Sequence, residues 1–181
     1  MTIKTISSRE VYRNPWTSVR EDVIERTNGV SGIYGVVDKD PAAIIIPLEV
    51  TAEGEFVYLI EQFRYTVGGR YWELPQGGWE MAEAIPEEMA HGELKEETGL
   101  VAARMIYAGE IFQGPGYCNQ RGHIFLATDL TQGDTDREVS EQDMITRDFT
   151  LADFEAMIRD GTIREAMTIS TFGLLRVKGL I

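Results

Sequence analysis

The sequence predicts an α+β protein built as an α/β/α sandwich, in which a mixed sheet lies between layers of helices. Alternating apolar and polar residues, the period of a strand, fill most of the first half of the chain. One helical pattern runs over residues 86–98, and two amphipathic helical patterns lie near the C-terminal end. At 181 residues the chain is one domain of ordinary size, with room for a small extension.

Strand patterns come first in the chain. Residues 7–38 alternate in polarity on both sides of the turn-forming segment NGVSG, which predicts strands. The β-branched run AAIIIPLEV, residues 42–50, predicts a fully buried strand. The segment EFVYLIEQFRY, residues 55–65, is expected to form a hairpin with that strand across the turn TAEGE. YWELPQGG, residues 71–78, predicts a short strand that ends at a proline and glycine break.

Helical patterns occupy the middle and the end of the chain. The first runs from Pro86, which suits the first turn of a helix, to Thr98, and Gly99 ends it. Two strands are predicted on either side of the loop GPGYCNQR, and two amphipathic helices close the chain. These four elements cover residues 103–114, 122–130, 150–161 and 164–179.

The composition is that of a soluble globular protein, with 43% hydrophobic and 26% charged residues. Thirty Asp and Glu against 17 Lys and Arg give a net charge of −13, which argues against nucleic acid or an anionic membrane as the main partner. Cys118 has no second cysteine to pair with, and the N-terminus lacks the apolar run of a signal peptide. Because the longest apolar stretch is too short to span a bilayer, we expect a cytoplasmic protein.

The segment HGELKEETGL carries an unusual cluster of acids. Glu93, Glu96 and Glu97 are three and four residues apart, so on a helix their carboxylates lie near one another. Exposed carboxylates at this spacing repel each other, and in the last turn the helix dipole favours cations instead. Taken alone, such a helix end is a solvated acidic face. A bound divalent cation would offset the repulsion, and Mg²⁺ prefers oxygen ligands of this kind.

Residues 77–100, GGWEMAEAIPEEMAHGELKEETGL, resemble the sequence box of the Nudix hydrolases. That box has a glycine, five residues, a glutamate, seven residues and then Arg-Glu-apolar-x-Glu-Glu-x-Gly-apolar. Gly92 stands where the family has arginine. We start the box at Gly77, which places Glu83 at its first glutamate and one extra residue in a tolerant loop; a start at Gly78 would place Ala84 there. The second half of the box is matched by Glu93, Leu94, Glu96, Glu97, Gly99 and Leu100.

The flanking segments resemble the branch of this family that hydrolyses ADP-ribose and nucleotide sugars. In IEQFRYTVGGRYWELPQGG, a glutamine-x-arginine strand with Arg64 precedes a tryptophan-glutamate-leucine-proline strand with Glu73. Pro115 stands where this branch carries a proline, and IRDGTIREAMTISTFGLL resembles its closing helix. The resemblance therefore covers most of the chain.

This resemblance implies a Nudix fold with two parts. Residues 1–40 would form an N-terminal antiparallel sheet used for dimerisation, and residues 41–181 would form the hydrolase domain. The implied activity is Mg²⁺-dependent hydrolysis of the pyrophosphate bond of ADP-ribose or related nucleoside diphosphate sugars, with Mn²⁺ as an alternative metal. The products would be a nucleoside monophosphate and a sugar phosphate, and the expected assembly is a homodimer in which the N-terminal segment contributes to nucleotide binding.

The site implied by the resemblance combines three groups of residues. Glu93, Glu96 and Glu97 are the predicted catalytic and metal-binding carboxylates, joined by a backbone carbonyl at Gln76 or Gly77. Simpler interpretations of the other side chains stay open: a strand arginine often forms a surface ion pair, a strand glutamate can be solvated, and the aromatic residues can belong to a core or interface. The predicted substrate contacts are Arg64, Glu73, Tyr34, Trp16, Pro115 and Gln120.

The identity of the general base stays open. In several pyrophosphatases of this branch the loop after the proline supplies a glutamate, but here Gln120 falls near that position. An amide cannot accept a proton at neutral pH, which leaves Glu96, Glu97 or Glu141 as the base. Two other functions are alternatives. A non-catalytic nucleotide-sugar sensor usually loses box acids, which this chain keeps, and a nucleoside triphosphate pyrophosphatase is disfavoured by the flanking motifs.

Overall fold

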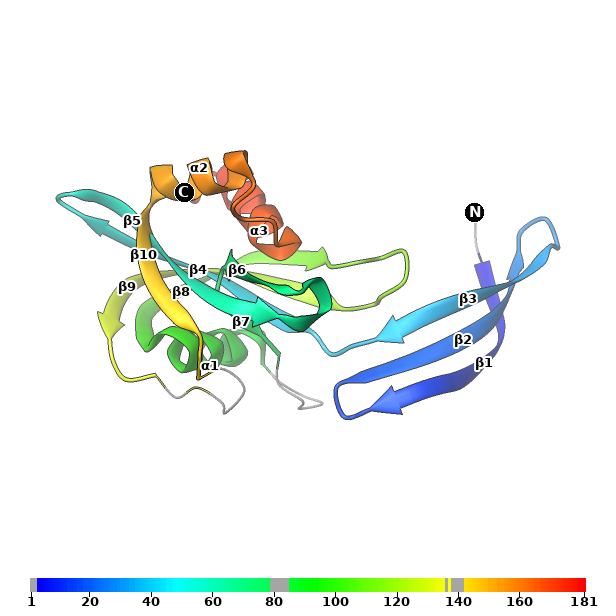
Figure 1. The fold of residues 1–181 in the computed structure, drawn as a ribbon. Coiled ribbons are helices and arrows are strands. Elements are labelled where there is room, and N and C mark those ends of the chain that lie inside the picture. The colour runs from blue at the N-terminus through cyan, green and yellow to red at the C-terminus, as the bar shows by residue number, and fades with distance from the viewer. Residues whose placement is uncertain (1–2, 79–84, 136, 138–141) are drawn as a thin grey trace. The chain divides into compact units, whose positions relative to one another are not determined.

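The computed structural model describes residues 3–78, 85–135, 137 and 142–181. These residues divide into two compact units (Figure 1). The first unit comprises Met1–Pro41 and Phe112–Arg121, and the second comprises Ala42–Ile111 and Gly122–Ile181. No helix in these described ranges is long and apolar enough to cross a membrane.

The first unit is built on a three-stranded antiparallel sheet in the order β1-β2-β3. Its strands are β1 (Ile3–Asn14), β2 (Thr17–Arg26) and β3 (Ser31–Asp38), so the predicted N-terminal antiparallel sheet is confirmed. The segment Phe112–Arg121 joins this unit through its backbone. Val37 N donates to Tyr117 O at 2.7 Å, and Asn119 N donates to Val37 O at 3.2 Å.

The second unit is built on a mixed sheet of seven strands. The central strand β4 runs parallel to β9 on one side and antiparallel to β5 on the other. The main strand order is β10-β5-β4-β9-β8, with β6 on β5 and β7 on β4. The strands are β4 (Ala42–Thr51), β5 (Gly54–Arg64), β6 (Gly69–Glu73), β7 (Gln76–Gly77), β8 (Leu100–Phe112), β9 (Arg121–Gln132) and β10 (Ile145–Thr150).

Helices cover both faces of this sheet, which confirms the predicted α+β sandwich. Helix α1 (Pro86–Thr98) lies on one face, and α2 (Leu151–Asp160) and α3 (Ala166–Val177) lie on the other (Figure 1). A short 3₁₀ turn, η1 (Tyr65–Val67), follows β5.

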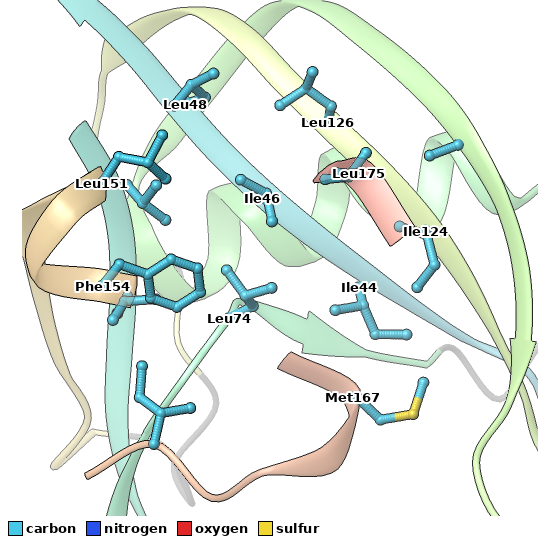
Figure 2. Packing of buried hydrophobic residues seen from close by; sticks show 14 residues of the cluster. Ile44, Ile46, Leu48, Leu74, Ile124, Leu126, Leu151, Phe154, Met167 and Leu175 are labelled. Carbon is cyan, nitrogen blue, oxygen red and sulfur yellow. The ribbon is translucent and has the colours of Figure 1, made fainter. Parts of the chain in front are cut away.

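Alternation along β4 produces the two cores, because successive side chains of a strand point to opposite faces. Ala43 and Ile45 pack in a cluster with Leu94 of α1. On the other face, the side chains around Phe154 of α2 and Leu175 of α3 form the larger cluster (Figure 2). That second cluster takes Ile44, Ile46 and Leu48 from the same strand.

Several elements differ from the predictions. The segment 145–150 forms strand β10, although its mixed sequence ITRDFT gave no strand signal. The predicted strand 71–78 is divided into β6 and β7 at Pro75, which has no N–H to donate to a ladder. Strand β8 begins at Leu100, directly after the left-handed Gly99 (φ 77°) that ends α1, and three residues earlier than the predicted start at 103.

The contact between α1 and the sheet predicts that substitutions at two neighbouring residues of α1 differ sharply in their effect on stability. Leu94 is 0% exposed, whereas Lys95 is exposed. We expect Leu94→Ala to lower the free energy of unfolding by about 2–5 kcal/mol, through lost apolar burial and the cavity left behind. Lys95→Arg should change it by less than about 0.5 kcal/mol. Urea denaturation of both variants measures the difference, and equal effects would contradict this packing.

Candidate active site

The acidic face of α1 meets the short strand β7. Ala43 and Ile44 of β4 pair with Gly77 and Gln76, which fixes β7 beside the central strand. A β-carbon added at Gly77 would lie 2.3 Å from Glu93 Oε2, inside van der Waals contact. The Glu93 carboxylate therefore occupies the space that a side chain at residue 77 would need, and any such side chain would displace it.

Glu97 is bonded to the same strand. Its Oε2 accepts a hydrogen bond of 2.9 Å from the backbone N–H of Gln76. The expectation of exposed carboxylates is wrong for two of the three acids: Glu93 is 8% exposed and Glu97 only 1%. Packing of α1 onto the sheet turns these two positions inward, while Glu96 is half-buried.

The metal-ligand prediction is not tested by these contacts. In the described parts of the chain, with gaps at 79–84, 136 and 138–141, no three His, Cys, Asp or Glu side chains form a group that could hold a metal ion. The structure does bring the carboxylates of Glu93 and Glu97 to the backbone of Gln76 and Gly77. Two buried carboxylates beside a strand backbone are donors of the oxygen type that Mg²⁺ prefers, so these residues fit a divalent cation.

The C-terminal end of α1 is held by a distant arginine. Arg137 donates from Nε and Nη2 to the Glu97 carbonyl at 2.9 and 2.7 Å, and Thr146 Oγ1 donates to the same carbonyl at 3.1 Å. A guanidinium here satisfies an end carbonyl and complements the negative end of the helix dipole. Sequence reasoning missed Arg137, because nothing in the local sequence links it to a helix forty residues earlier.

Arg64 and Glu73 form an ion pair between β5 and β6. Arg64 Nε lies 3.0 and 3.1 Å from the two Glu73 oxygens, and Nη2 lies 2.5 Å from Oε2. Glu73 is 1% exposed, so it is not the solvated strand residue of the simpler interpretation. Its Oε2 also accepts a hydrogen bond of 3.1 Å from Gln76 Nε2.

Charge around Arg64 extends beyond this pair. Burial of the guanidinium acts to lower the pKa of Arg64, but the hydrogen bond and charge of Glu73, with the charges of Glu97 and Glu165, outweigh it and raise that pKa. Glu165 caps α3 by accepting hydrogen bonds from Met167 N and Thr168 N, at 2.8 and 2.6 Å. Arg64 is thus a permanent cation among acidic side chains.

The first unit contains a cavity of about 260 Å³. Tyr34 and Pro115, two of the predicted substrate contacts, both line it, and Tyr34 donates a hydrogen bond of 2.9 Å to Gly116 O. The lining is largely aromatic and apolar, with one guanidinium. The complete lining is Tyr34, Val36, Phe112, Pro115, Tyr117, Cys118, Asn119 and Arg121.

The remaining predicted residues lie elsewhere. Trp16 is 71% exposed in the turn between β1 and β2 and does not line the cavity. Gln120 Nε2 donates to Asp40 O at 2.9 Å, which ties the 112–121 segment to the end of β3. Glu83, Ala84 and Glu141 lie outside the described residues, so the start of the box and one candidate base have no structural account.

Comparisons with known proteins agree with this arrangement. The profile of the NUDIX domain matches residues 38–166, and that of the nucleoside diphosphate sugar hydrolase N-terminal domain matches residues 3–37. An ADP-ribose pyrophosphatase of Bacillus subtilis (strain 168) is 28% identical over 176 residues, which cover 97% of this chain and 93% of that protein. An ADP-ribose pyrophosphatase of Mycobacterium tuberculosis is 29% identical over 175 residues, covering 96% and 82%.

A solved structure shares the fold. The crystal structure of an ADP compounds hydrolase superposes with a TM-score of 0.83 at 22% identity, covering 99% of this chain and 96% of that one. The NUDIX profile spans well over half of the sequence, and its acidic box coincides with the face of α1 that meets β7. The chain therefore belongs to the Nudix hydrolase family.

Proposed function

We propose that this protein hydrolyses the pyrophosphate bond of ADP-ribose or a related nucleoside diphosphate sugar with the help of Mg²⁺, or alternatively Mn²⁺. The observation that carries this proposal is the pair of buried carboxylates, Glu93 and Glu97, held against β7 within the family's acidic box. The names of the relatives, ADP-ribose pyrophosphatases that align along nearly the whole chain, support the substrate class.

The proposed metal ligands are the carboxylates of Glu93 and Glu97, with Glu96 and a backbone carbonyl of Gln76 or Gly77. These residues would hold a divalent cation, which would neutralise negative charge on the pyrophosphate. Water then adds to one phosphorus while the bond from that phosphorus to the bridging oxygen breaks. The candidates to accept the proton of the water are the carboxylates of Glu96, Glu97 and Glu141.

Substrate contacts are proposed in both units. Arg64 is 38% exposed at its side chain, and its Nη1 donates to no residue in the described ranges, so it is suited to a phosphate oxygen. The ion pair between Glu73 and this guanidinium supports a role for Glu73 in orienting Arg64. In the first unit, we assign nucleobase binding to the cavity with Tyr34 and Pro115, since aromatic and apolar walls suit a planar ring. Trp16 and Gln120 are proposed as further contacts.

A homodimer through residues 1–40 is part of the proposal. Strand β1 is an edge strand of twelve residues, and all but its last residue are exposed. The sheet also exposes Ile6, Tyr12 and Ile33, which are 53%, 56% and 68% exposed. A long exposed edge strand that carries apolar side chains is normally paired or covered, and a second copy related by a two-fold axis can do both. We propose that the partner's nucleotide binding uses this segment. A cytoplasmic location agrees with the single cysteine.

The reaction is tested by a turnover assay with Mg²⁺ over a panel of substrates. ADP-ribose, ADP-glucose, GDP-mannose and deoxynucleoside triphosphates separate the proposed activity from the alternatives. We expect a nucleoside monophosphate and a sugar phosphate from ADP-ribose or another member of its class. Preference for the triphosphates would indicate a nucleoside triphosphate pyrophosphatase. Tight nucleotide-sugar binding without products would indicate a sensor.

Glu97→Gln should abolish most turnover while the protein stays folded. The amide retains an oxygen that can accept from Gln76 N–H, so the free energy of unfolding should change by no more than about 1.5 kcal/mol. Loss of a charged ligand should lower kcat by about a thousandfold or more. Steady-state kinetics at saturating Mg²⁺ and circular dichroism measure both effects. Near-wild-type kcat in this variant would show that the Glu97 carboxylate is not required for turnover.

Mg²⁺ or Mn²⁺ should raise the melting temperature of the wild-type protein. A ligand that binds only the folded state adds about 2.7 kcal/mol of stability at a concentration one hundred times its dissociation constant. Differential scanning fluorimetry across millimolar metal measures the shift. The double variant Glu93→Gln with Glu97→Gln is the control and should show none. An unchanged wild-type melting curve would count against the proposed cation site.

Light scattering should give twice the chain mass of 20.4 kDa. Ile6→Asp places a charge on the exposed edge strand, so we expect it to shift the protein toward monomer with the unfolding free energy changed by less than about 0.5 kcal/mol. The control variant is Glu53→Asp, which changes an exposed residue in the β4–β5 turn. It should leave the mass unchanged. A fully active wild-type monomer at assay concentration would rule out the proposed dimer.

A further inference from the structure

The backbone N–H and the side-chain amide of Gln76 each donate a hydrogen bond to a different buried carboxylate. Its backbone N–H donates to Glu97 Oε2 at 2.9 Å, and its side-chain Nε2 donates to Glu73 Oε2 at 3.1 Å. Each of these two glutamates is 1% exposed. One residue therefore links the acid of α1 to the acid of β6.

The Glu73 end of this link is firmly held. Arg64 bonds both Glu73 oxygens, so the carboxylate is neutralised and its orientation is fixed by a forked guanidinium. Glu73 also lies in β6, and its ladder partner is Ile60 of β5, which is 0% exposed. The amide of Gln76 thus has a rigid acceptor.

The other end of the link is a very short strand. Strand β7 is only Gln76–Gly77, and its ladder consists of two pairs with β4. The same two residues carry the N–H that holds Glu97 and the Gly77 backbone that lies against the Glu93 carboxylate. A small displacement of β7 would therefore move both carboxylates relative to the backbone.

We propose that the side chain of Gln76 is a positioning residue that holds β7 in register with Glu93 and Glu97 and thereby sets the affinity of the protein for a divalent cation. This inference rests on the proposed function, since it requires that the two glutamates bind metal. The side-chain amide acts through the backbone and through Glu73, and it is not a ligand itself.

The test compares Gln76→Met with Gln132→Met. Methionine at residue 76 keeps the length of the side chain but loses the amide. Gln132 is the matched control, because its Nε2 donates to Thr98 O and Gly133 O near the same end of α1 and, among the described residues, to no carboxylate. Both variants lose glutamine hydrogen bonds beside α1, so both can lower the melting temperature.

The decisive measurement is Mn²⁺ binding to the full-length protein, followed by the electron paramagnetic resonance signal of free Mn²⁺. We expect the dissociation constant to rise about tenfold in Gln76→Met, as for loss of one hydrogen bond to a charged group, and to stay within about twofold of wild type in Gln132→Met. The Mg²⁺ concentration for half-maximal turnover should rise in parallel. If Gln76→Met does not fold, Gln76→Asn keeps the amide but is too short for Glu73, and carries the same expectation.

Each result has one meaning. An unchanged Mn²⁺ dissociation constant in a folded Gln76 variant, or an equal rise in Gln132→Met, overturns the inference alone. A wild-type protein that binds no Mn²⁺ overturns both the inference and the proposed metal-dependent hydrolysis.

Discussion

The hydrogen bond from Gln76 N–H to the Glu97 carboxylate is the constraint on which the site depends. A carboxylate that is 1% exposed is costly to bury unless a donor meets it. The donor comes from β7, which is fixed by its ladder with the central strand β4. In that register the next residue, Gly77, lies against Glu93, and a side chain there would displace the Glu93 carboxylate. The glycine and the glutamates of the box are therefore one structural unit, although fifteen or more residues separate them in sequence.

The last turn of α1 carries an acid cluster at the negative end of the helix dipole. Groups from other parts of the chain compensate for this concentration of negative charge. The guanidinium of Arg137 and the hydroxyl of Thr146 meet the Glu97 carbonyl, and Gly99 ends the helix in a left-handed conformation. Arg64 adds a cation on the side of the carboxylates, close enough for the charge of Glu97 to raise its pKa. Gly92 occupies the position at which the family has arginine, so in this chain the neighbouring positive charges come from β5 and from residue 137.

The sequence allowed the fold class, α1 and the box acids to be predicted, because each depends on local periodicity or on a spaced motif. The burial of Glu97 could not be predicted, since it depends on which face of α1 packs on the sheet. The pairing of Arg64 with Glu73 also could not be predicted, because it depends on the register between β5 and β6. Strand β10 was missed for a related reason: ITRDFT becomes a strand through its antiparallel pairing with β5 rather than through its own pattern.

The segment Phe112–Arg121 shows that the first unit is built from two separate parts of the chain. It lies between β8 and β9 in the chain, yet it belongs to the first unit. Backbone bonds from Val37 to Tyr117 and Asn119, and the bond from Tyr34 to Gly116 O, hold it beside β3. Without β3 these backbone groups would lose their partners, and such groups must then find water or another hydrogen-bond partner. The walls of the cavity with Tyr34 and Pro115 therefore exist only when the N-terminal sheet and this loop fold together.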